Sequence, residues 1–356
     1  MKKYPMVFII MSMMLSLCCG TAQSSDIKDK SAAQTSMAAA SPSSSSDAAT
    51  AEITPFSKHG KLRVEGADLV DKNGKKYQLY GMSTHGIAWF PQYVNKKAFQ
   101  TLRDDWNTNC IRISMYTYEN GGYCTDGNQK NLNHLVTTGV NAATELGMYV
   151  IIDWHILREE SPNVYKDEAV EFFNMMSSRF CHNDNVIYEI CNEPNGSSDW
   201  SDIRRYAETV IPVIRKNDSD AVIIVGTPTW SQGIDKACDD PLEYDNIMYA
   251  LHFYADTHRQ WLRDRAETCY KKGLPIFISE FNITDSSGNS NVNTEEGDLW
   301  MKLISKYNFS YLCWSLSNTN QPHSVISGYK LSGWNESDLT VTGKWLYKYF
   351  IAEDNQ

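Results

Sequence analysis

Several motifs that mark common enzyme classes are missing from this chain of 356 residues. It has no Gly-X-Ser-X-Gly nucleophile motif, no Gly-X-Gly-X-X-Gly dinucleotide-binding motif and no Walker A phosphate-binding motif. It also lacks the Cys-X-X-Cys pairs of common zinc and redox sites. These absences argue against a serine hydrolase of the nucleophile-elbow type, a dinucleotide-dependent enzyme and a nucleoside triphosphatase.

Basic residues are outnumbered by acidic ones, 33 to 43, which gives a formal net charge of −10. This balance disfavours nucleic acid and other polyanions as partners and suits a neutral ligand. Aromatic residues are plentiful by contrast, at 12% of the chain with ten Trp and twenty Tyr. Such a composition fits either an aromatic-rich core or a cleft in which aromatic rings stack on sugars.

The cysteines do not indicate a disulfide framework. Two of the nine lie near the N-terminus, and the remaining seven are an odd number without metal-site spacing. Three lie in or beside apolar runs and are expected to be small core residues: Cys110, Cys191 and Cys313. One disulfide could form among the other four, which are Cys124, Cys181, Cys238 and Cys269.

The N-terminal 20 residues are typical of an export signal. Met1-Lys2-Lys3 is basic, and Met6–Leu17 is an uncharged apolar run that is too short to span a bilayer. Cys18 lies where a bacterial lipoprotein signal places its acylated cysteine, so residues 1–20 are either a secretory or a lipoprotein signal. We expect a chain that is secreted or lipid-anchored at the bacterial cell surface or periplasm. Residues 21–52 are rich in Ser and Ala and are expected to form a flexible linker.

Residues 53–353 predict a single α/β domain. Leu62–Val70 and Tyr77–Met82 flank an Asn73-Gly74 turn signal, which predicts a short N-terminal β-hairpin. Continuous apolar runs then alternate with helical patterns, as in parallel strands that are buried on both faces. Eight such units in series predict a (β/α)₈ TIM barrel, with a short helix in the fifth unit. The predicted strands are Gln78–Met82, Cys110–Met115, Tyr149–Trp154, Val186–Cys191, Val222–Gly226, Ile247–His252, Ile276–Glu280 and Ser310–Trp314.

Polar and aromatic residues recur where these strands end, which is the reactive face of a TIM barrel. They are His85, Arg112, Trp154-His155, Asn192-Glu193, Trp230, His252 with Tyr254, Glu280 and Trp314. The histidines come from different strands without a carboxylate ligand at helical spacing, so we expect no metal site. A single residue of this kind is usually structural, but a set on one rim predicts an active site.

Glu193 and Glu280 are the two carboxyl groups that glycosidic-bond cleavage requires. Arg112 and Tyr254 are expected to keep Glu280 charged as a nucleophile, and the pair repulsion is expected to keep Glu193 protonated as the acid. Asn192 offers an amide to the sugar 2-hydroxyl.

Four further residues complete the predicted site. His155 and His252 either bind sugar hydroxyls or orient the acid, unless they serve only as structural support. Trp314 and Trp89 present flat faces for pyranose rings, although Trp89 could instead pack within its loop.

At this point the chain resembles glycoside hydrolase family 5, and most of all its bacterial endo-β-1,4-glucanases. Ile190-Cys191-Asn192-Glu193-Pro194 resembles the Asn-Glu-Pro signature of that family, and the resemblance runs from about Lys58 to Phe350. Other segments similar to the family are Gly81–Gly86, Leu102–Trp106, Ile151–His155, Val210–Arg215 and His252–Tyr254.

The resemblance implies a glycoside hydrolase barrel over residues 53–353 that hydrolyses internal β-1,4 bonds of cellulose-type polymers with retention. It implies Glu193 as acid/base and Glu280 as nucleophile, without a cofactor, and a β-glucan as the partner. We also expect a monomer. It places Arg112, His155, Asn192, His252, Tyr254 and Trp314 around the cleaved sugar, and His85 and Trp89 in the glucan cleft.

The chain departs from the family in two places. Relatives usually read Ser-Glu-Trp-Gly at the nucleophile, whereas this chain reads Ser279-Glu280-Phe281-Asn282. After Trp314 it lacks the usual sugar-binding Lys and acidic residue, so neutral Asn318 or Asn320 would replace them. The alternatives are a mannan-, lichenan- or xyloglucan-active hydrolase, a transglycosylase with the same residues, and a non-catalytic carbohydrate-binding barrel, which the presence of both carboxyl groups disfavours.

Overall fold

A computed structural model describes residues 52–288 and 291–352. The predicted export signal and all but the last residue of the predicted linker lie outside this range. Within the described residues, no helix combines the length and the apolar character needed to cross a membrane.

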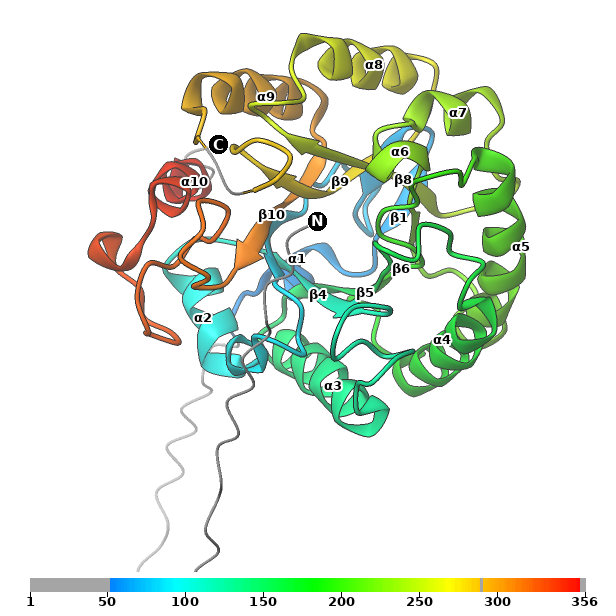
Figure 1. The fold of residues 1–356 in the computed structure, drawn as a ribbon, viewed down its shortest axis with the longest axis horizontal. Helices are drawn as coiled ribbons and strands as arrows, with labels where there is room; N and C mark the ends of the chain where they lie inside the picture. Colours follow the sequence, from blue (N-terminus) through cyan, green and yellow to red (C-terminus); the bar gives the residue numbers. More distant parts are fainter. Residues whose placement is uncertain (1–51, 289–290, 353–356) are drawn as a thin grey trace, which may run out of the picture. The chain divides into compact units, whose positions relative to one another are not determined.

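Eight parallel strands close into a barrel in the order β10-β3-β4-β5-β6-β7-β8-β9 (Figure 1). Each strand pairs with its neighbours in the chain, and β10 pairs with β3 to close the sheet. The predicted TIM barrel is therefore confirmed. The strands are β3 Tyr80–Thr84, β4 Cys110–Tyr116, β5 Tyr149–His155, β6 Val186–Glu189, β7 Ile223–Val225, β8 Ile247–Tyr254, β9 Ile276–Asn282 and β10 Ser310–Leu316.

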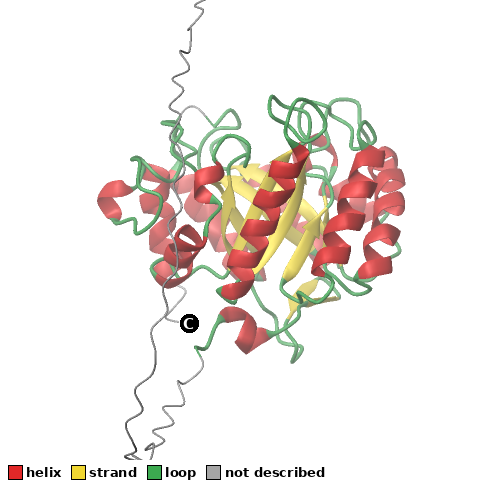
Figure 2. Cartoon of the chain, turned by 90° about the horizontal axis from the view of Figure 1, so that it is seen from below, coloured by secondary structure: helices red, strands yellow, loops and turns green. Residues whose placement is uncertain are grey.

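Helices cover the outside of this barrel (Figure 2). In α4 the apolar residues at helical spacing are all buried: Ala169, Phe172, Phe173, Met176 and Phe180. The fifth unit has only a short helix, α7, as expected. The helices are α1 Pro55–His59, α2 Lys96–Asp104, α3 Gln129–Glu145, α4 Lys166–Phe180, α5 Trp200–Asn217, α6 Pro228–Ser231, α7 Ile234–Asp239, α8 Gln260–Lys271, α9 Thr294–Tyr307 and α10 Val341–Ala352, with 3₁₀ turns at Pro91–Tyr93 and Glu336–Asp338.

The period of two along each strand divides the interior into two cores. In β4, Ile111 and Ile113 belong to the large apolar cluster between strands and helices, whereas Cys110 belongs to a separate cluster inside the barrel. Leu62 and Leu69, from the N-terminal segment, also belong to this inner cluster. The inner cluster contains the residues at the beginning of the strands, so an apolar floor fills the amino end of the barrel and polar residues occupy the layer above it.

The predicted N-terminal hairpin is confirmed, but its turn lies elsewhere. β1 (Arg63–Glu65) pairs antiparallel with β2 (Asp68–Val70) around Gly66, whose φ is +62°. The Asn73-Gly74 turn follows β2 and forms only one bridge, between Val70 and Lys76. Asp71 explains this second turn, because its Oδ1 accepts hydrogen bonds from the backbone N–H groups of Asn73 and Lys75 at 2.8 and 3.1 Å.

β9 contains a bulge beside the polar layer. Ala250 pairs with Phe277 but His252 pairs with Glu280, so β9 has one residue more than β8 over this stretch. The pairing with β10 shifts at the same place. Because of the extra residue, Ser279 and Glu280 both face the interior, while Ile278 belongs to the outer cluster. Regular alternation would have turned Glu280 to the same side as Ile278.

All seven cysteines of the described residues are free thiols. Cys110, Cys191 and Cys313 are fully buried, which confirms their prediction as core residues. The disulfide that the sequence allowed is absent from this part of the chain.

Candidate active site

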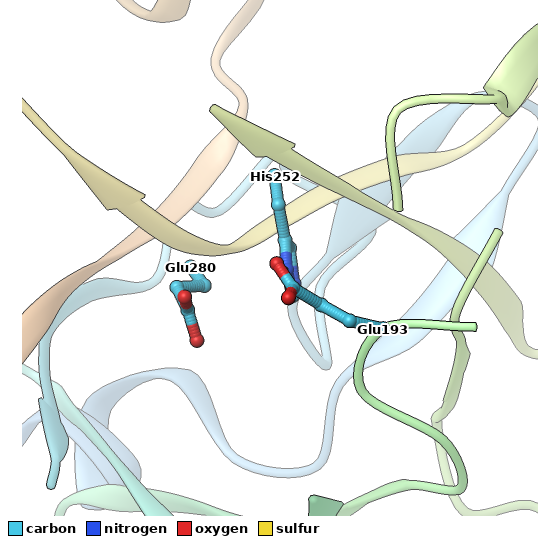
Figure 3. Close-up of side chains that lie close together, drawn as sticks. All are labelled: Glu193, His252 and Glu280. Carbon is cyan, nitrogen blue, oxygen red and sulfur yellow. The ribbon is translucent and has the colours of Figure 1, made fainter. Parts of the chain in front are cut away.

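Glu193 and Glu280 face one cavity at the carboxyl end of the barrel. Glu193 follows β6 and Glu280 lies in the bulge of β9. With His252 of β8 they form a cluster in which one donor atom from each residue lies within 4.8 Å of the others (Figure 3). The cavity measures about 550 Å³ and is lined by both glutamates and by Tyr116, His155, Leu157, Thr229, Trp230, Gln232, His252, Tyr254, His258, Ser286 and Trp314.

Arg112 is the central cation of this site. Its side chain is completely buried and is surrounded by three carboxyl groups. Nε donates to Glu189 Oε2 at 2.7 Å, Nη1 to Glu280 Oε2 at 3.2 Å, and Nη2 lies 3.1 Å from Asp153 Oδ2. Burial alone would raise the pKa of Glu189, but Arg112 and His252 lower it to about 2, so Glu189 is an anion at all ordinary pH values.

A hydrogen-bond chain leads from Arg112 to His155 through Asn192. Arg112 Nη2 donates to Asn192 Oδ1 at 2.6 Å, so the amide nitrogen of Asn192 faces His155 Nε2 at 3.2 Å and Ile156 O at 3.1 Å. His155 Nε2 is therefore an acceptor, and Nδ1 carries the proton toward Asp153 Oδ2 at 2.6 Å. Burial and the nearby Arg112 lower the pKa of His155 to about 3, which keeps this imidazole neutral.

His252 connects the two sides of the site. Its Nδ1 lies 3.0 Å from Glu193 Oε1 and its Nε2 lies 2.9 Å from Ser279 Oγ, which in turn donates to Glu189 Oε1 at 2.7 Å. Burial alone would lower the pKa of His252, but the neighbouring carboxyl groups of Glu189, 3.8 Å from Nε2, and Glu193 raise it to about 9. His252 is therefore an imidazolium at neutral pH and donates to Glu193.

Glu280 accepts hydrogen bonds on both carboxyl oxygens. Tyr254 Oη donates to Oε1 at 2.9 Å, and Arg112 donates to Oε2. Burial and the neighbouring Glu193 raise the pKa of Glu280, while His252 and Arg112 oppose that rise. Glu280 thus ionises above its usual range, but with two donors in place for the anion.

Aromatic rings line the site on the side of β3 and β10. The Trp314 ring stacks on His155 with 5.2 Å between centroids and lies 4.9 Å from the His85 ring. Trp89 lies 5.6 Å from His85 and remains 36% exposed. His85 Nδ1 accepts from the N–H of Gly86 at 2.8 Å, so its proton is on Nε2.

The cluster of Glu193, His252 and Glu280 contains residue types that bind metal ions, but its chemistry does not fit a cation. Both nitrogens of His252 already have hydrogen-bond partners, and the ring is itself cationic. Arg112 adds a second positive charge beside Glu280. The arrangement instead suits a carboxyl pair in which one group is charged and the other holds a proton.

Comparison with known proteins shows the family. A family model described as cellulase, glycosyl hydrolase family 5, matches residues 70–320. The chain belongs to glycosyl hydrolase family 5. It is 47% identical over 293 residues to Endoglucanase A of Butyrivibrio fibrisolvens and 44% identical over 301 residues to an endoglucanase of Clostridium saccharobutylicum. These matches cover 81% and 84% of this chain, and 68% and 66% of the two relatives, so the match spans about two thirds of their length.

Solved cellulase structures agree with the fold over nearly all of their length. The cellulase Cel5C_n is 40% identical with a TM-score of 0.81, and the match covers 83% of this chain and 94% of that one. The catalytic domain of Thermobifida fusca endoglucanase Cel5A, solved with cellotetraose, is 35% identical with a TM-score of 0.80, and covers 84% of this chain and 99% of that one. The resemblance inferred from the sequence motifs is confirmed, and the chain is a glycoside hydrolase.

The structure brings most of the predicted site residues to one region of this family 5 barrel, and Trp230 lines the cavity there. Trp154 does not belong to this region, because its side chain turns outward, is completely buried and packs on Phe172 and Phe173 of α4. The residues brought together are His85, Trp89, Arg112, His155, Asn192, Glu193, His252, Tyr254, Glu280 and Trp314. Sequence reasoning did not assign Tyr116, Asp153, Glu189 and Ser279 to the site. A signal for Asp153 and Tyr116 exists, because each lies on the same side of its strand as His155 or Arg112.

The departures from the family pattern have structural explanations in part. Asn282 is buried, and its side-chain nitrogen donates to the carbonyl oxygens of Trp314 and, at 3.2 Å, of His323. The added bulk therefore links β9 to the segment after β10. Asn318 donates to Gly328 O at 2.9 Å, which occupies its amide within the loop, and Asn320 is exposed.

Replacing Arg112 with Met should destabilise the protein by about 3–5 kcal/mol, because it leaves buried carboxylates without their cation. In the wild type the pKa of Glu189 is lower in the folded than in the unfolded state. Glu189 therefore contributes stability at pH values above its unfolded pKa, and this contribution is lost as the pH falls through the folded pKa of about 2. In Arg112→Met that depression disappears. The loss measured by urea unfolding should therefore be largest at neutral pH and shrink toward pH 4.

Arg263→Met is the matched control for this measurement. Arg263 is also buried, but it pairs with one carboxylate, Glu296, whose side chain is 19% exposed. Its loss should be smaller and nearly independent of pH, because Glu296 keeps contact with water. An equal and pH-independent loss in both variants would contradict the role given to Arg112.

Proposed function

We propose that this protein is a retaining endo-β-1,4-glucanase that hydrolyses internal bonds of cellulose and related β-glucans by double displacement. The observation that carries the proposal is the separation of the two carboxyl groups, whose oxygens lie within 4.8 Å. Retaining glycosidases place them roughly 5–5.5 Å apart, whereas inverting enzymes leave about 6.5–9.5 Å for a water molecule. The endoglucanase names of the relatives support the same activity and substrate class.

Glu280 is the nucleophile. Its carboxylate has donors on both oxygens, Tyr254 and Arg112, which stabilise the charged form. In the first step Glu280 attacks the anomeric carbon, and the bond from that carbon to the glycosidic oxygen breaks. Glu193 gives its proton to this oxygen, so the departing chain leaves as an alcohol and a glucosyl ester forms on Glu280.

Glu193 acts a second time as the base. It takes a proton from a water molecule, whose oxygen attacks the anomeric carbon and releases the Glu280 carboxylate. Two inversions at the same carbon give net retention. The imidazolium of His252 donates to Glu193 Oε1, which holds the carboxyl in one orientation and stabilises the charge that develops when Glu193 loses its proton.

The remaining residues position the sugar. Asn192 lies between Arg112 and His155, where its amide can turn from Ile156 O to the 2-hydroxyl of the bound sugar. His85 presents a protonated Nε2, a donor for a ring hydroxyl. Trp314, backed by the stacked His155, and the half-exposed Trp89 offer apolar faces for pyranose rings.

Glu193→Gln and Glu280→Gln should each lower the rate on carboxymethyl-cellulose by about 10²-fold or more, because each removes a proton donor or the nucleophile. The assay measures reducing ends released from carboxymethyl-cellulose, mannan and mixed-linkage glucan. Glu208→Gln, an exposed glutamate on α5, is the control. Proton NMR of the wild-type reaction should show the β-anomer first.

Azide rescue separates the two roles. With an activated aryl cellobioside, azide should give a β-glycosyl azide in Glu193→Ala and an α-glycosyl azide in Glu280→Ala. Wild-type rates in either glutamine variant, or an α-anomer as the first product, would overturn the mechanism. Activity on mannan alone would instead correct the substrate class.

The pH dependence should report the ionisation of Glu280. Its pKa is raised from 4.5, and the nucleophile must be charged, so kcat/KM should fall on the acidic side with a midpoint above pH 4.5. Tyr254→Phe removes a donor to the carboxylate and should move this midpoint to higher pH. The measurement covers about pH 3–7, a range on both sides of the usual carboxyl pKa. An unchanged midpoint in the variant would contradict the assignment.

The proposal extends to export of the enzyme as a monomer that is secreted or lipid-anchored through Cys18. Support comes from the basic start and the apolar run Met6–Leu17. Mass spectrometry of the mature N-terminus should show a chain cleaved before or near Cys18. A diacylglyceryl mass on Cys18 indicates an anchor, an unmodified cleaved end indicates secretion, and an intact Met1 in the cytoplasm contradicts export.

A further inference from the structure

Beside Glu193 the cavity is lined by Thr229, Trp230 and Gln232, which belong to a different part of its wall from Trp314. Glu193 protonates the departing oxygen in the proposed mechanism, so the departing chain must lie on this side. The backbone after β7 forms the boundary here: Trp230 N donates to Pro194 O at 3.0 Å, and Ser231 Oγ donates to Asn192 O at 2.6 Å.

This boundary is held in an unusual backbone conformation. Thr229, Trp230 and Ser231 have φ values of 60°, 53° and 55°, the left-handed region that residues other than Gly rarely adopt. Three such residues in succession persist only where surrounding contacts fix them. The result is a rigid segment that leaves the Trp230 side chain 44% exposed in the wall of the catalytic cavity.

A second cavity of about 700 Å³ begins on the other side of this segment. Thr229 and Gln232 line both cavities, so the two lie side by side. The second one lies among the loops that follow β6 and β7 and the start of α8, which is the same end of the barrel. Trp261 and Arg265 of α8 form its outer wall.

Trp261 is exposed and yet held in place. Its side chain is 47% exposed, and its ring lies 6.0 Å from that of His258, a residue of the catalytic cavity. The guanidinium of Arg265 lies 5.3 Å from the Trp261 ring centre. Arg265 is itself fixed, because Nη1 donates to Gln232 O at 2.9 Å and lies 3.2 Å from Asp235 Oδ1.

These contacts define the chemistry of a ligand. The charges that line the cavity balance. Arg265 and Lys236 lie 3.2 and 3.5 Å from Asp235, and Asp199 adds a second carboxylate, so the described lining has no net positive charge for an anionic ligand. An immobilised indole that remains half exposed is an apolar surface for a flat ring face, and the electron-rich ring suits the C–H face of a pyranose. The cavity volume is within the range of small-ligand sites.

We propose that Trp261 and the cavity beside it form a distal binding site for glucosyl units of the departing chain, beyond the unit next to the cleaved bond. This inference rests on the proposed function. It adds a second aromatic contact, on α8, to that of Trp230, which belongs to the rigid segment between the two cavities. A longer substrate thereby gains binding that a shorter one cannot reach.

The test uses the intact protein and a series of cello-oligosaccharides from cellotriose to cellohexaose, labelled at the reducing end. Trp261→Ala should lower kcat/KM by an amount that grows with chain length, to about tenfold for cellohexaose, a loss of the size expected for one ring contact. The cleavage position should shift toward the reducing end, because long departing fragments lose their contact. Trp261→Phe, which keeps a ring, should restore most of the loss.

Leu299→Ala is the control, since Leu299 is 46% exposed on another outer helix, α9. An equal loss at all chain lengths, or no loss at any length, would overturn the distal site. Wild-type protein that cleaves none of these oligosaccharides would overturn the proposed function instead. In that case the distal site is tested by calorimetry of cellohexaose binding to Glu280→Gln. Adding Trp261→Ala to this variant should weaken binding about tenfold. Unchanged binding would contradict the inference.

Discussion

The ion-pair cluster around Arg112 is the interaction on which the rest of the site depends. A guanidinium that is completely buried is expensive to desolvate, and so is each of the carboxyl groups around it. The attraction between the guanidinium and the carboxyl groups offsets these desolvation costs. The planar guanidinium can donate to several partners at once. Three hydrogen-bond paths begin at Arg112. One leads through Asn192 to His155, and another leads directly to Glu280. The third leads through Glu189 and Ser279 to His252 and then to Glu193.

The bulge in β9 is the second constraint, because it supplies an interior position that regular alternation does not have. Ser279 and Glu280 both face inward, so one strand serves the path to His252 and also provides the nucleophile. Bulges of this kind commonly re-aim side chains beside active sites. The cavity then opens at the carboxyl end of the strands, where loops can vary without altering the barrel.

Much of this arrangement could be predicted from sequence, for physical reasons that apply to particular residues. Parallel strands buried on both faces require continuous apolar runs, so all eight strands were visible, and polar residues at their ends marked one rim. The bulge could not be predicted, because the run Ile276–Glu280 reads the same with or without an extra residue. The role of Glu189 was hidden at the end of an apolar run, whereas Asp153 could have been found from its place two residues before His155. The hairpin turn was misplaced because Gly66 and Gly74 both offer a left-handed residue, and only the pairing decides between them.

The separation of the two cores has a consequence for how such a protein can change. Each strand of the barrel presents apolar side chains to the helices and, from alternate positions, polar side chains to the cleft. A substitution at Met115 or Phe253 acts on the resistance of the fold to heat, whereas one at its neighbour Tyr116 or Tyr254 acts on the cavity. Adaptation to a new temperature and adaptation to a new polysaccharide can therefore proceed through adjacent codons with little interference between them.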